Sequence, residues 1–192
     1  MLPTGDKAIR AGEAGEKRIQ EILMLYKASN HLNGKLFKNV YLGHGEHTKE
    51  TDFVFITSKG VFVVEVKNWI GQIEGTLIDD EWVQIITYVT IRPKNPIKQN
   101  RKHAEKLKSV IDNDMKKFPY YPITVFVKNN APEIRSDELT NLSKLTSFLD
   151  RFGKDNHISN KDIEMACKLL ETYIKMCGVT KEQHLRNVHK FE

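Results

Sequence analysis

The chain has 192 residues, enough for one domain of ordinary size, and its 40% hydrophobic and 29% charged residues are typical of a soluble globular protein. No stretch approaches the roughly 20 apolar residues that span a bilayer, the polar start of the chain lacks a signal-peptide core, and two cysteines are too few for a disulfide framework. We therefore expect a cytoplasmic protein without membrane contact, and its net charge of +5 slightly favours polyanionic partners.

The first pattern along the chain is an amphipathic helix. Its apolar residues follow the spacing i, i+3, i+4 and i+7 and form one stripe of Ile19, Ile22, Leu23 and Tyr26. The same face carries small residues nearer the N-terminus, which would allow a close approach to a flat surface: Ala8, Gly12 and Gly15. Glu16 lies about 70° from the centre of the stripe, so its carboxylate can reach over the edge towards a sheet.

Strand patterns follow the helix. Residues 36–42, 51–57 (TDFVFIT) and 60–69 (GVFVVEVKNW) are rich in β-branched and aromatic residues. Ser58-Lys59-Gly60 reads as a tight turn, so the second and third runs should form an antiparallel hairpin. Residues 73–78 and 82–89 offer further strands around a turn at Asp79-Asp80.

The second half of the chain is mainly helical. Asn95 as N-cap and Pro96 as the first helical residue predict a helix whose core stripe is Asn100, His103, Ala104, Leu107 and Ile111. Residues 123–127 predict a short buried strand, and residues 139–148 and 158–176 predict helices, with a polar segment from Thr180 onward. We expect an α/β fold in which residues 1–130 form the core and residues 131–192 form a helical extension packed on it.

The predicted hairpin brings charged residues together. If Thr57 and Gly60 close a two-residue turn, Asp52 faces Glu65 with Cβ atoms about 4.5–5.5 Å apart. Two carboxylates so placed repel each other unless a divalent cation lies between them. Strand alternation puts Lys67 on the same face as Glu65. A bulged turn would spoil this register, and the structural alternative is that Glu65 and Lys67 simply mark where the strand emerges into water.

Other polar and aromatic residues have simpler interpretations. Asn100 and His103 fall on the core-facing stripe, where we expect satisfied hydrogen bonds. Trp69 and Trp82 are more typical of core residues than of a platform for base stacking. The loop residues His44, Glu46 and His47 lack the helical geometry of a zinc site, because glycines lie at positions 43 and 45.

Several motifs in order carry a resemblance to a known family. They are residues 12–16 (GEAGE), Thr51-Asp52, residues 59–68 (KGVFVVEVKN), Gly71, Gly75, Trp82 and residues 95–103 (NPIKQNRKH). Over about residues 11 to 127 the chain resembles the nuclease-related domain (NERD) family, a branch of the PD-(D/E)XK restriction-endonuclease-like superfamily. The resemblance implies a central four-stranded mixed sheet flanked by helices, with a phosphodiesterase site made of Glu16, Asp52, Glu65 and Lys67 and with Gln99 as an auxiliary residue.

These residue types suit a metal-dependent nuclease, and we expect its nucleic-acid substrate to be DNA in preference to RNA as the leading hypothesis. Asp52 and Glu65 would bind Mg²⁺, or Mn²⁺ in its place, and Lys67 would activate the attacking water. The segment from Thr90 to Lys108 has a single acid, and its basic residues would hold the substrate backbone: Arg92, Lys94, Lys98, Arg101 and Lys102. The alternatives are a non-catalytic nucleic-acid-binding module and a helical interaction protein. Two cuts on a duplex would suit a homodimer.

Overall fold

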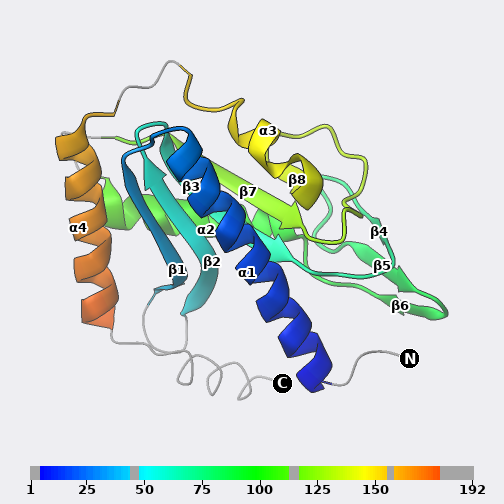
Figure 1. Ribbon diagram of the computed structural model, residues 1–192. Helices are drawn as coiled ribbons and strands as arrows, with labels where there is room; N and C mark the ends of the chain where they lie inside the picture. Colours follow the sequence, from blue (N-terminus) through cyan, green and yellow to red (C-terminus); the bar gives the residue numbers. More distant parts are fainter. Residues whose placement is uncertain (1–4, 44–47, 113–116, 155–157, 178–192) are drawn as a thin grey trace.

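A computed structural model describes residues 5–43, 48–112, 117–154 and 158–177 (Figure 1). In chain order the elements are α1 (Gly5–Ser29), β1 (Gly34–Leu42), β2 (Lys49–Thr57), β3 (Gly60–Lys67), β4 (Gln72–Glu74), β5 (Val83–Ile86), β6 (Val89–Ile91), α2 (Pro96–Ile111), β7 (Tyr120–Phe126), β8 (Leu139–Asn141), the 3₁₀ helix η2 (Leu142–Lys144), α3 (Leu145–Leu149) and α4 (Asn160–Cys177).

The centre of the fold is a mixed five-stranded sheet in the order β1-β2-β3-β7-β8. The first three strands are antiparallel, whereas β7 is parallel to β3 and β8 is parallel to β7. A separate antiparallel sheet of β4, β5 and β6 extends from the end of the main sheet where β3 terminates (Figure 1). This mixed α/β arrangement is consistent with the expected restriction-endonuclease-like fold.

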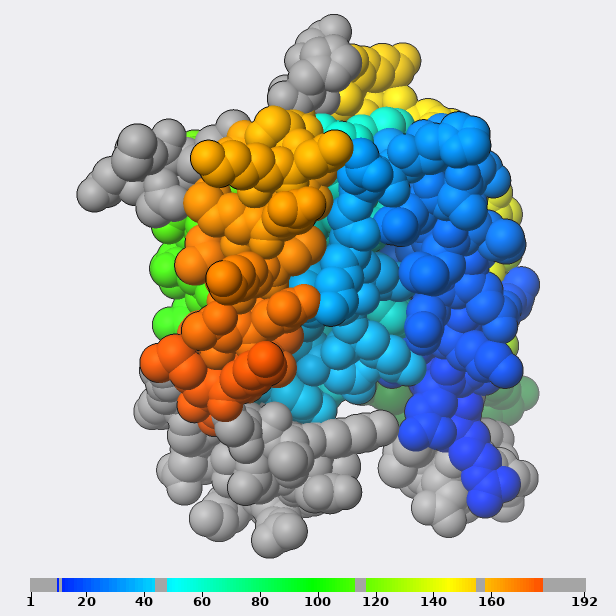
Figure 2. Space-filling model, turned by 60° about the vertical axis from the view of Figure 1, so that its left-hand side comes forward, coloured from blue at the N-terminus to red at the C-terminus, as the bar shows by residue number. Residues whose placement is uncertain are grey.

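Helices cover both faces of the main sheet. On one face, Ile19 and Leu23 of α1 pack against Phe53, Phe55 and other β2 and β3 side chains. On the opposite face, α2 and α4 enclose a second core cluster with the alternate residues of the same strands. Figure 2 shows β1 at the surface, between the orange α4 and the dark blue α1. The predicted stripe of α1 is confirmed, because Ile19, Leu23 and Tyr26 are buried and Ile22 packs against them.

The hairpin of β2 and β3 has the predicted register. Thr57 pairs with Gly60 and Ile56 pairs with Val61, so Ser58 and Lys59 form the two-residue turn without a bulge. Gly60 has φ of 142°, a conformation that L side chains rarely adopt, and Pro119 and Tyr121 leave no room for a Cβ atom there. The turn therefore fixes which side chains of β2 and β3 share a face.

Three strand and helix predictions need correction. Residues 139–148 do not form one helix, because Leu139–Asn141 pairs with β7 as a fifth strand where four were implied. The 82–89 run is broken at Thr87 and Tyr88, where Thr87 has φ of 54° and the chain reverses from β5 into β6. In the 73–78 run the strand stops at Glu74, and Asp79 Oδ2 accepts a hydrogen bond from the Thr76 N–H.

The helix α2 begins and packs as predicted. The Asn95 side chain accepts hydrogen bonds from the backbone N–H groups of Ile97 and Lys98, and Pro96 is the first helical residue. All five residues of the predicted stripe are buried. Asn95 also donates to the carbonyls of Thr76 and Asp79, which ties the start of α2 to the loop after β4.

The chain beyond residue 130 contributes to the same cores. Ile163, Ala166 and Leu170 of α4 lie in the cluster beneath α2 and β1, while Leu145 and Phe148 of α3 lie in the cluster beneath α1. The division at residue 130 stays a prediction. Cys167 and Cys177 form no disulfide. No helix among the described residues is long and apolar enough to cross a membrane.

Candidate active site

Asp52 and Glu65 converge at one end of the β2–β3 hairpin. The pairing of Phe53 with Val64 places Asp52 opposite Glu65 one step further along. Asp52 Oδ2 accepts a hydrogen bond of 2.6 Å from the backbone N–H of Val66, which fixes this carboxylate against β3. Strand alternation puts both carboxylates on the sheet face that α2 covers.

Lys67 connects this pair to the first turn of α2. Its Nζ lies 2.6 Å from Glu65 Oε1 and 3.5 Å from Gln99 Oε1. The side chains of Lys67 and Glu65 are only 15% and 6% exposed. Four of the five residues predicted to be catalytic, Asp52, Glu65, Lys67 and Gln99, therefore meet at one end of the β2–β3 hairpin.

His103 belongs to this cluster, although its position in the sequence indicated only a core hydrogen bond. Its Nδ1 lies 3.6 Å from Glu65 Oε2, and the His103 side chain is 4% exposed. Neither atom has a hydrogen-bond partner among the described residues. Burial lowers the pKa of His103 despite the nearby Glu65 charge, which favours a neutral imidazole at neutral pH. The signal in the sequence was a histidine on the core-facing stripe one turn beyond Gln99.

Asn100 is buried as the sequence predicts, but its hydrogen bonds are only partly satisfied, because its Oδ1 has no partner among the described residues. Its Nδ2 donates a hydrogen bond of 2.9 Å to the Val63 carbonyl, two residues before Glu65. This contact joins α2 to β3 directly behind the carboxylates. It therefore helps to position Gln99 and His103 over the strand that carries Glu65 and Lys67.

The electrostatics of the cluster leave negative charge incompletely compensated. Burial first, and then the charge of Glu65, raise the pKa of Asp52 well above its usual range, although Val66 and Lys67 act in the opposite direction. The buried Glu65 Oε2 has no hydrogen-bond partner in the described part of the chain. Both features fit a divalent cation, which prefers carboxylate oxygens.

The protein would supply only part of such a coordination shell. Within residues 5–43, 48–112, 117–154 and 158–177, no group of three or more His, Cys, Asp or Glu side chains could hold a metal ion. Asp52 and Glu65 would thus be two ligands, with water and phosphate oxygens in the remaining positions. Mg²⁺ is commonly bound in this way, because it keeps several waters.

Glu16 stands apart from the other predicted catalytic residues. Its Oε2 lies 3.2 Å from Lys38 Nζ, and that ammonium lies 5.9 Å from the centre of the Phe53 ring. Phe53 faces α1, so Glu16 and Lys38 lie on the face opposite to Glu65. Gly15 brings this turn of α1 against the end of the sheet, since a Cβ atom there would lie 3.1 Å from Val127. The charge of Glu16 contributes weakly to the raised pKa of Asp52.

Comparison with known proteins identifies the family of the chain. The nuclease-related domain family matches residues 11–127, more than half of the chain. The chain belongs to the nuclease-related domain family. It is also 32% identical over 106 residues to an uncharacterized protein of Bacillus anthracis, covering 54% of this chain and 48% of that protein. The chain thus spans about half the length of this curated relative. None of the solved structures matches it.

The basic segment of this nuclease-related domain divides into two groups. Lys98 Nζ contacts the Ile78 carbonyl and lies 2.7 Å from Asp80 Oδ1, while Arg101 forms a two-pronged ion pair with Glu138. The three other residues predicted to hold the substrate backbone are exposed and form no ion pair with a described residue: Arg92, Lys94 and Lys102. Lys98 and Arg101 thus hold the start of α2 against neighbouring loops, and the other three are the cations free to meet a ligand.

The two tryptophans are placed as core residues. Trp82 is fully buried, and its indole N–H donates to the Thr76 carbonyl, so it cannot stack on a base. Trp69 is partly buried and meets Phe126 edge-on, with Lys67 Nζ 5.5 Å from its ring centre. The loop residues His44, Glu46 and His47 lie outside the described residues.

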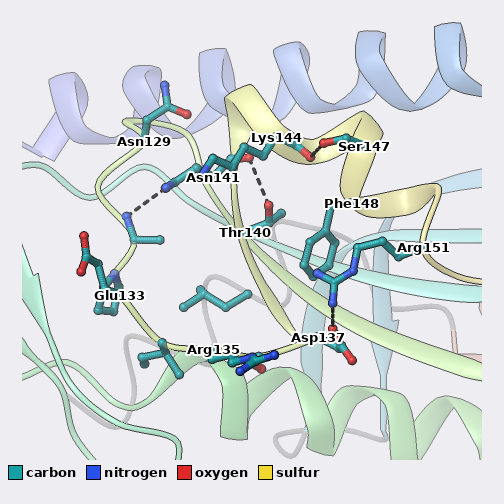
Figure 3. A pocket seen from close by; sticks show the side chains of 15 residues that line it. Asn129, Glu133, Arg135, Asp137, Thr140, Asn141, Lys144, Ser147, Phe148 and Arg151 are labelled. Carbon is teal, nitrogen blue, oxygen red and sulfur yellow. Dashed lines mark hydrogen bonds and ion pairs between the residues drawn. The ribbon is translucent and has the colours of Figure 1, made fainter.

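A separate pocket of about 990 Å³ lies between two parts of the chain (Figure 3). One part is residues 129–141, and the other is the pair of short helices η2 and α3. Asp137 and Arg151 pair across it, and Arg135 and Lys144 also line it. Asp52, Glu65, Lys67 and Gln99 are not part of its lining. It also lies beyond the segment that matches the family, so the carboxylate cluster and not this pocket is the candidate active site.

Proposed function

We propose that this nuclease-related domain hydrolyses phosphodiester bonds of DNA in a reaction that requires Mg²⁺, with Mn²⁺ as a substitute. The observation that carries the proposal is the meeting of Asp52, Glu65 and Lys67 at a buried strand end, where Glu65 Oε2 has no hydrogen-bond partner among the described residues. A purely structural cluster would avoid placing two carboxylates together without enough positive charge.

Each residue of the cluster has a chemical task in this proposal. A bound divalent cation supplies positive charge for the phosphate oxygens and lowers the pKa of water. Asp52 and Glu65 hold that cation. Lys67 donates a hydrogen bond to the attacking water and orients it for in-line attack on phosphorus. Gln99 positions the Lys67 ammonium from α2, and His103 packs beside the Glu65 carboxylate.

Substrate binding is assigned to the exposed cations on the same side of the molecule as the start of α2. Arg92, Lys94 and Lys102 would contact phosphates beside the cut site. Such contacts give affinity without base selectivity, because every nucleotide presents the same phosphate. They also make binding dependent on salt.

We expect Lys102→Ala and Arg101→Ala to have different effects. Lys102→Ala should reduce the slope of log affinity against log salt by about 0.9 for duplex DNA, because one phosphate contact is lost. Arg101→Ala should instead lower the melting temperature, since it releases the ion pair with Glu138. Fluorescence anisotropy at several salt concentrations, with thermal melts of both variants, measures this difference. Equal salt slopes for Lys102→Ala and wild type would remove Lys102 from the binding surface.

The proposal is tested by incubating the protein with single-stranded DNA, supercoiled plasmid or RNA in Mg²⁺, Mn²⁺ or EDTA. We expect cleavage of DNA in either metal and none in EDTA. Binding of DNA in EDTA with no cleavage in any metal would instead identify a non-catalytic binding module. Cleavage that persists in EDTA would contradict the metal requirement.

A further inference from the structure

The hairpin of β5 and β6 forms an exposed arm beyond the main sheet. Tyr88 at its turn is 98% exposed, and Val89 and Ile91 on β6 are 41% and 38% exposed. Figure 1 shows the hairpin projecting from the body of the protein, with its turn furthest out. Together Tyr88, Val89 and Ile91 give this short hairpin an exposed apolar surface, and such a surface indicates a binding site.

The base of this arm is fixed in the protein core. Trp82, just before β5, is fully buried and stacks on Phe126 of β7 with ring centres 6.2 Å apart. Gln84 is buried and donates a hydrogen bond of 2.9 Å to the Ile70 carbonyl. A Cβ atom at Gly75 would lie 2.3 Å from Trp82, so this glycine allows the close packing. The rigid base holds the exposed tip in a defined direction.

The arm is connected to the candidate active site through β4, which pairs with β5, and through the segment that follows β6. Lys67 ends β3, and residues 68–71 lead from it into β4. Residues 92–95 lead from β6 into α2, which carries Gln99 in its first turn. Lys67 Nζ and Gln99 Oε1 lie 3.5 Å apart, so the arm extends from the point where the two sides of the site meet. A polymer held at Lys67 can therefore run on towards the arm.

The charges around the arm favour a polyanion over a protein partner. From Val83 to Lys94 the sequence contains Arg92 and Lys94 and no acidic residue. Both cations are exposed and form no ion pair with a described residue. The nearest acids lie at the base, where Glu81 pairs with Lys94 through the backbone and Glu74 accepts a hydrogen bond from Gln72. An exposed aromatic side chain near exposed basic side chains is the combination that binds single-stranded nucleic acid.

We propose that the β5–β6 hairpin binds the nucleic acid beside the cut site and that the Tyr88 ring stacks on an unpaired base. This inference rests on the proposed function and names the preferred substrate, a strand with exposed bases. Tyr88 is seven residues from Asn95, a span of at most about 25 Å of extended chain. At about 3.4 Å per nucleotide, the contacted base lies no more than about seven nucleotides from the start of α2.

The test measures binding separately from cleavage. In EDTA, anisotropy of a labelled single-stranded oligonucleotide should show about tenfold weaker binding for Tyr88→Ala, which corresponds to about 1.4 kcal/mol and lies within the range found for stacking. Tyr88→Phe should bind as wild type does, because the ring is kept. Leu25→Ala is the matched control, since Leu25 is 67% exposed on α1, away from the arm.

A second readout locates the contact. The fluorescent base analogue 2-aminopurine, moved one position at a time along the strand, should be quenched by wild type at a restricted set of positions and not by Tyr88→Ala. Equal affinity of wild type and Tyr88→Ala for single strands would overturn the proposal even if the protein cuts DNA. If cleavage fails in every metal while the Tyr88-dependent binding persists, the nuclease activity is rejected and the proposed binding by the β5–β6 hairpin stands. A change in self-association without a change in DNA affinity would assign the tip to a second copy of the chain and overturn the proposal.

Discussion

Replacing Asp52 with asparagine should raise the melting temperature of the metal-free protein by roughly 2–4 °C, the shift given by about 1 kcal/mol in a chain of this size, while it removes DNA cleavage. Asparagine keeps an oxygen that can accept the hydrogen bond from the Val66 N–H. It also removes a charge that burial and Glu65 make unfavourable, because both raise the pKa of Asp52. Gain of stability with loss of activity is the signature of a functional site that is strained without its ligand.

The stability gain should depend on pH in a defined direction. The folded-state pKa of Asp52 is raised above its unfolded value, so ionised Asp52 destabilises the folded protein. This cost is absent below the unfolded pKa of about 3.9, grows as pH rises through the folded pKa, and is complete above it. The difference in melting temperature between Asp52→Asn and wild type should therefore vanish at acidic pH and be largest above the folded pKa.

Thermal melts in EDTA and in Mg²⁺ measure both effects. Mg²⁺ should raise the melting temperature of wild type and leave that of Asp52→Asn nearly unchanged. Glu164→Gln is the matched control, because Glu164 is an exposed carboxylate on α4. A lower melting temperature for Asp52→Asn in EDTA at neutral pH would show that this carboxylate stabilises the fold instead of being held there for a cation.

Replacing Lys67 with alanine should reduce the cleavage rate by about 10²-fold, because the attacking water is then no longer held in line with phosphorus. In contrast to Asp52→Asn, it should also destabilise the protein. The Lys67 Nζ atom lies 2.6 Å from Glu65 Oε1, and the Glu65 side chain is only 6% exposed. Removal of one partner of a buried ion pair costs about 3–5 kcal/mol, because the remaining charge is left uncompensated.

A double variant separates the two roles of Lys67. Glu65→Gln combined with Lys67→Ala should recover much of the lost stability, since the Glu65 charge that Lys67 compensated is then also removed, and it should still not cleave DNA. Denaturant melts in EDTA and cleavage rates at a temperature where every variant is folded measure the two properties. Lys161→Ala, an exposed lysine on α4, serves as the control. A Lys67→Ala protein with wild-type cleavage would remove Lys67 from the chemistry.

The sequence predicted the centre of the site because local rules determine it. The Ser58-Lys59 turn determines the register of the hairpin, and the register determines that Asp52 lies opposite Glu65. Asn95 and Pro96 likewise mark the start of α2, which places Gln99 near Lys67. The turn, the register and the start of α2 depend only on residues close together in the chain or on strand alternation, whereas the place of Gln99 in the site was implied by the family resemblance.

Features that depend on contacts between distant segments were missed. Glu16 could be assigned to an edge of its helix, but its pairing with Lys38 depends on how α1 crosses the sheet. The three residues of β8 carry no strand signal of their own and form a strand because β7 offers an open edge. The pairing of Arg101 with Glu138 follows from that added strand, since the Glu138 carbonyl accepts from Thr124 of β7.

Cleavage of supercoiled plasmid by wild type and Asp52→Asn, each in Mg²⁺, Mn²⁺ and EDTA, tests the assignment of the active site most directly. The structure predicts nicked or linear product for wild type in either metal, none in EDTA, and none for an Asp52→Asn protein whose melting temperature is at least that of wild type. Equal cleavage by the two proteins would contradict the role of Asp52. Absence of cleavage by wild type in any metal, on plasmid and on single strands, would contradict the nuclease activity itself.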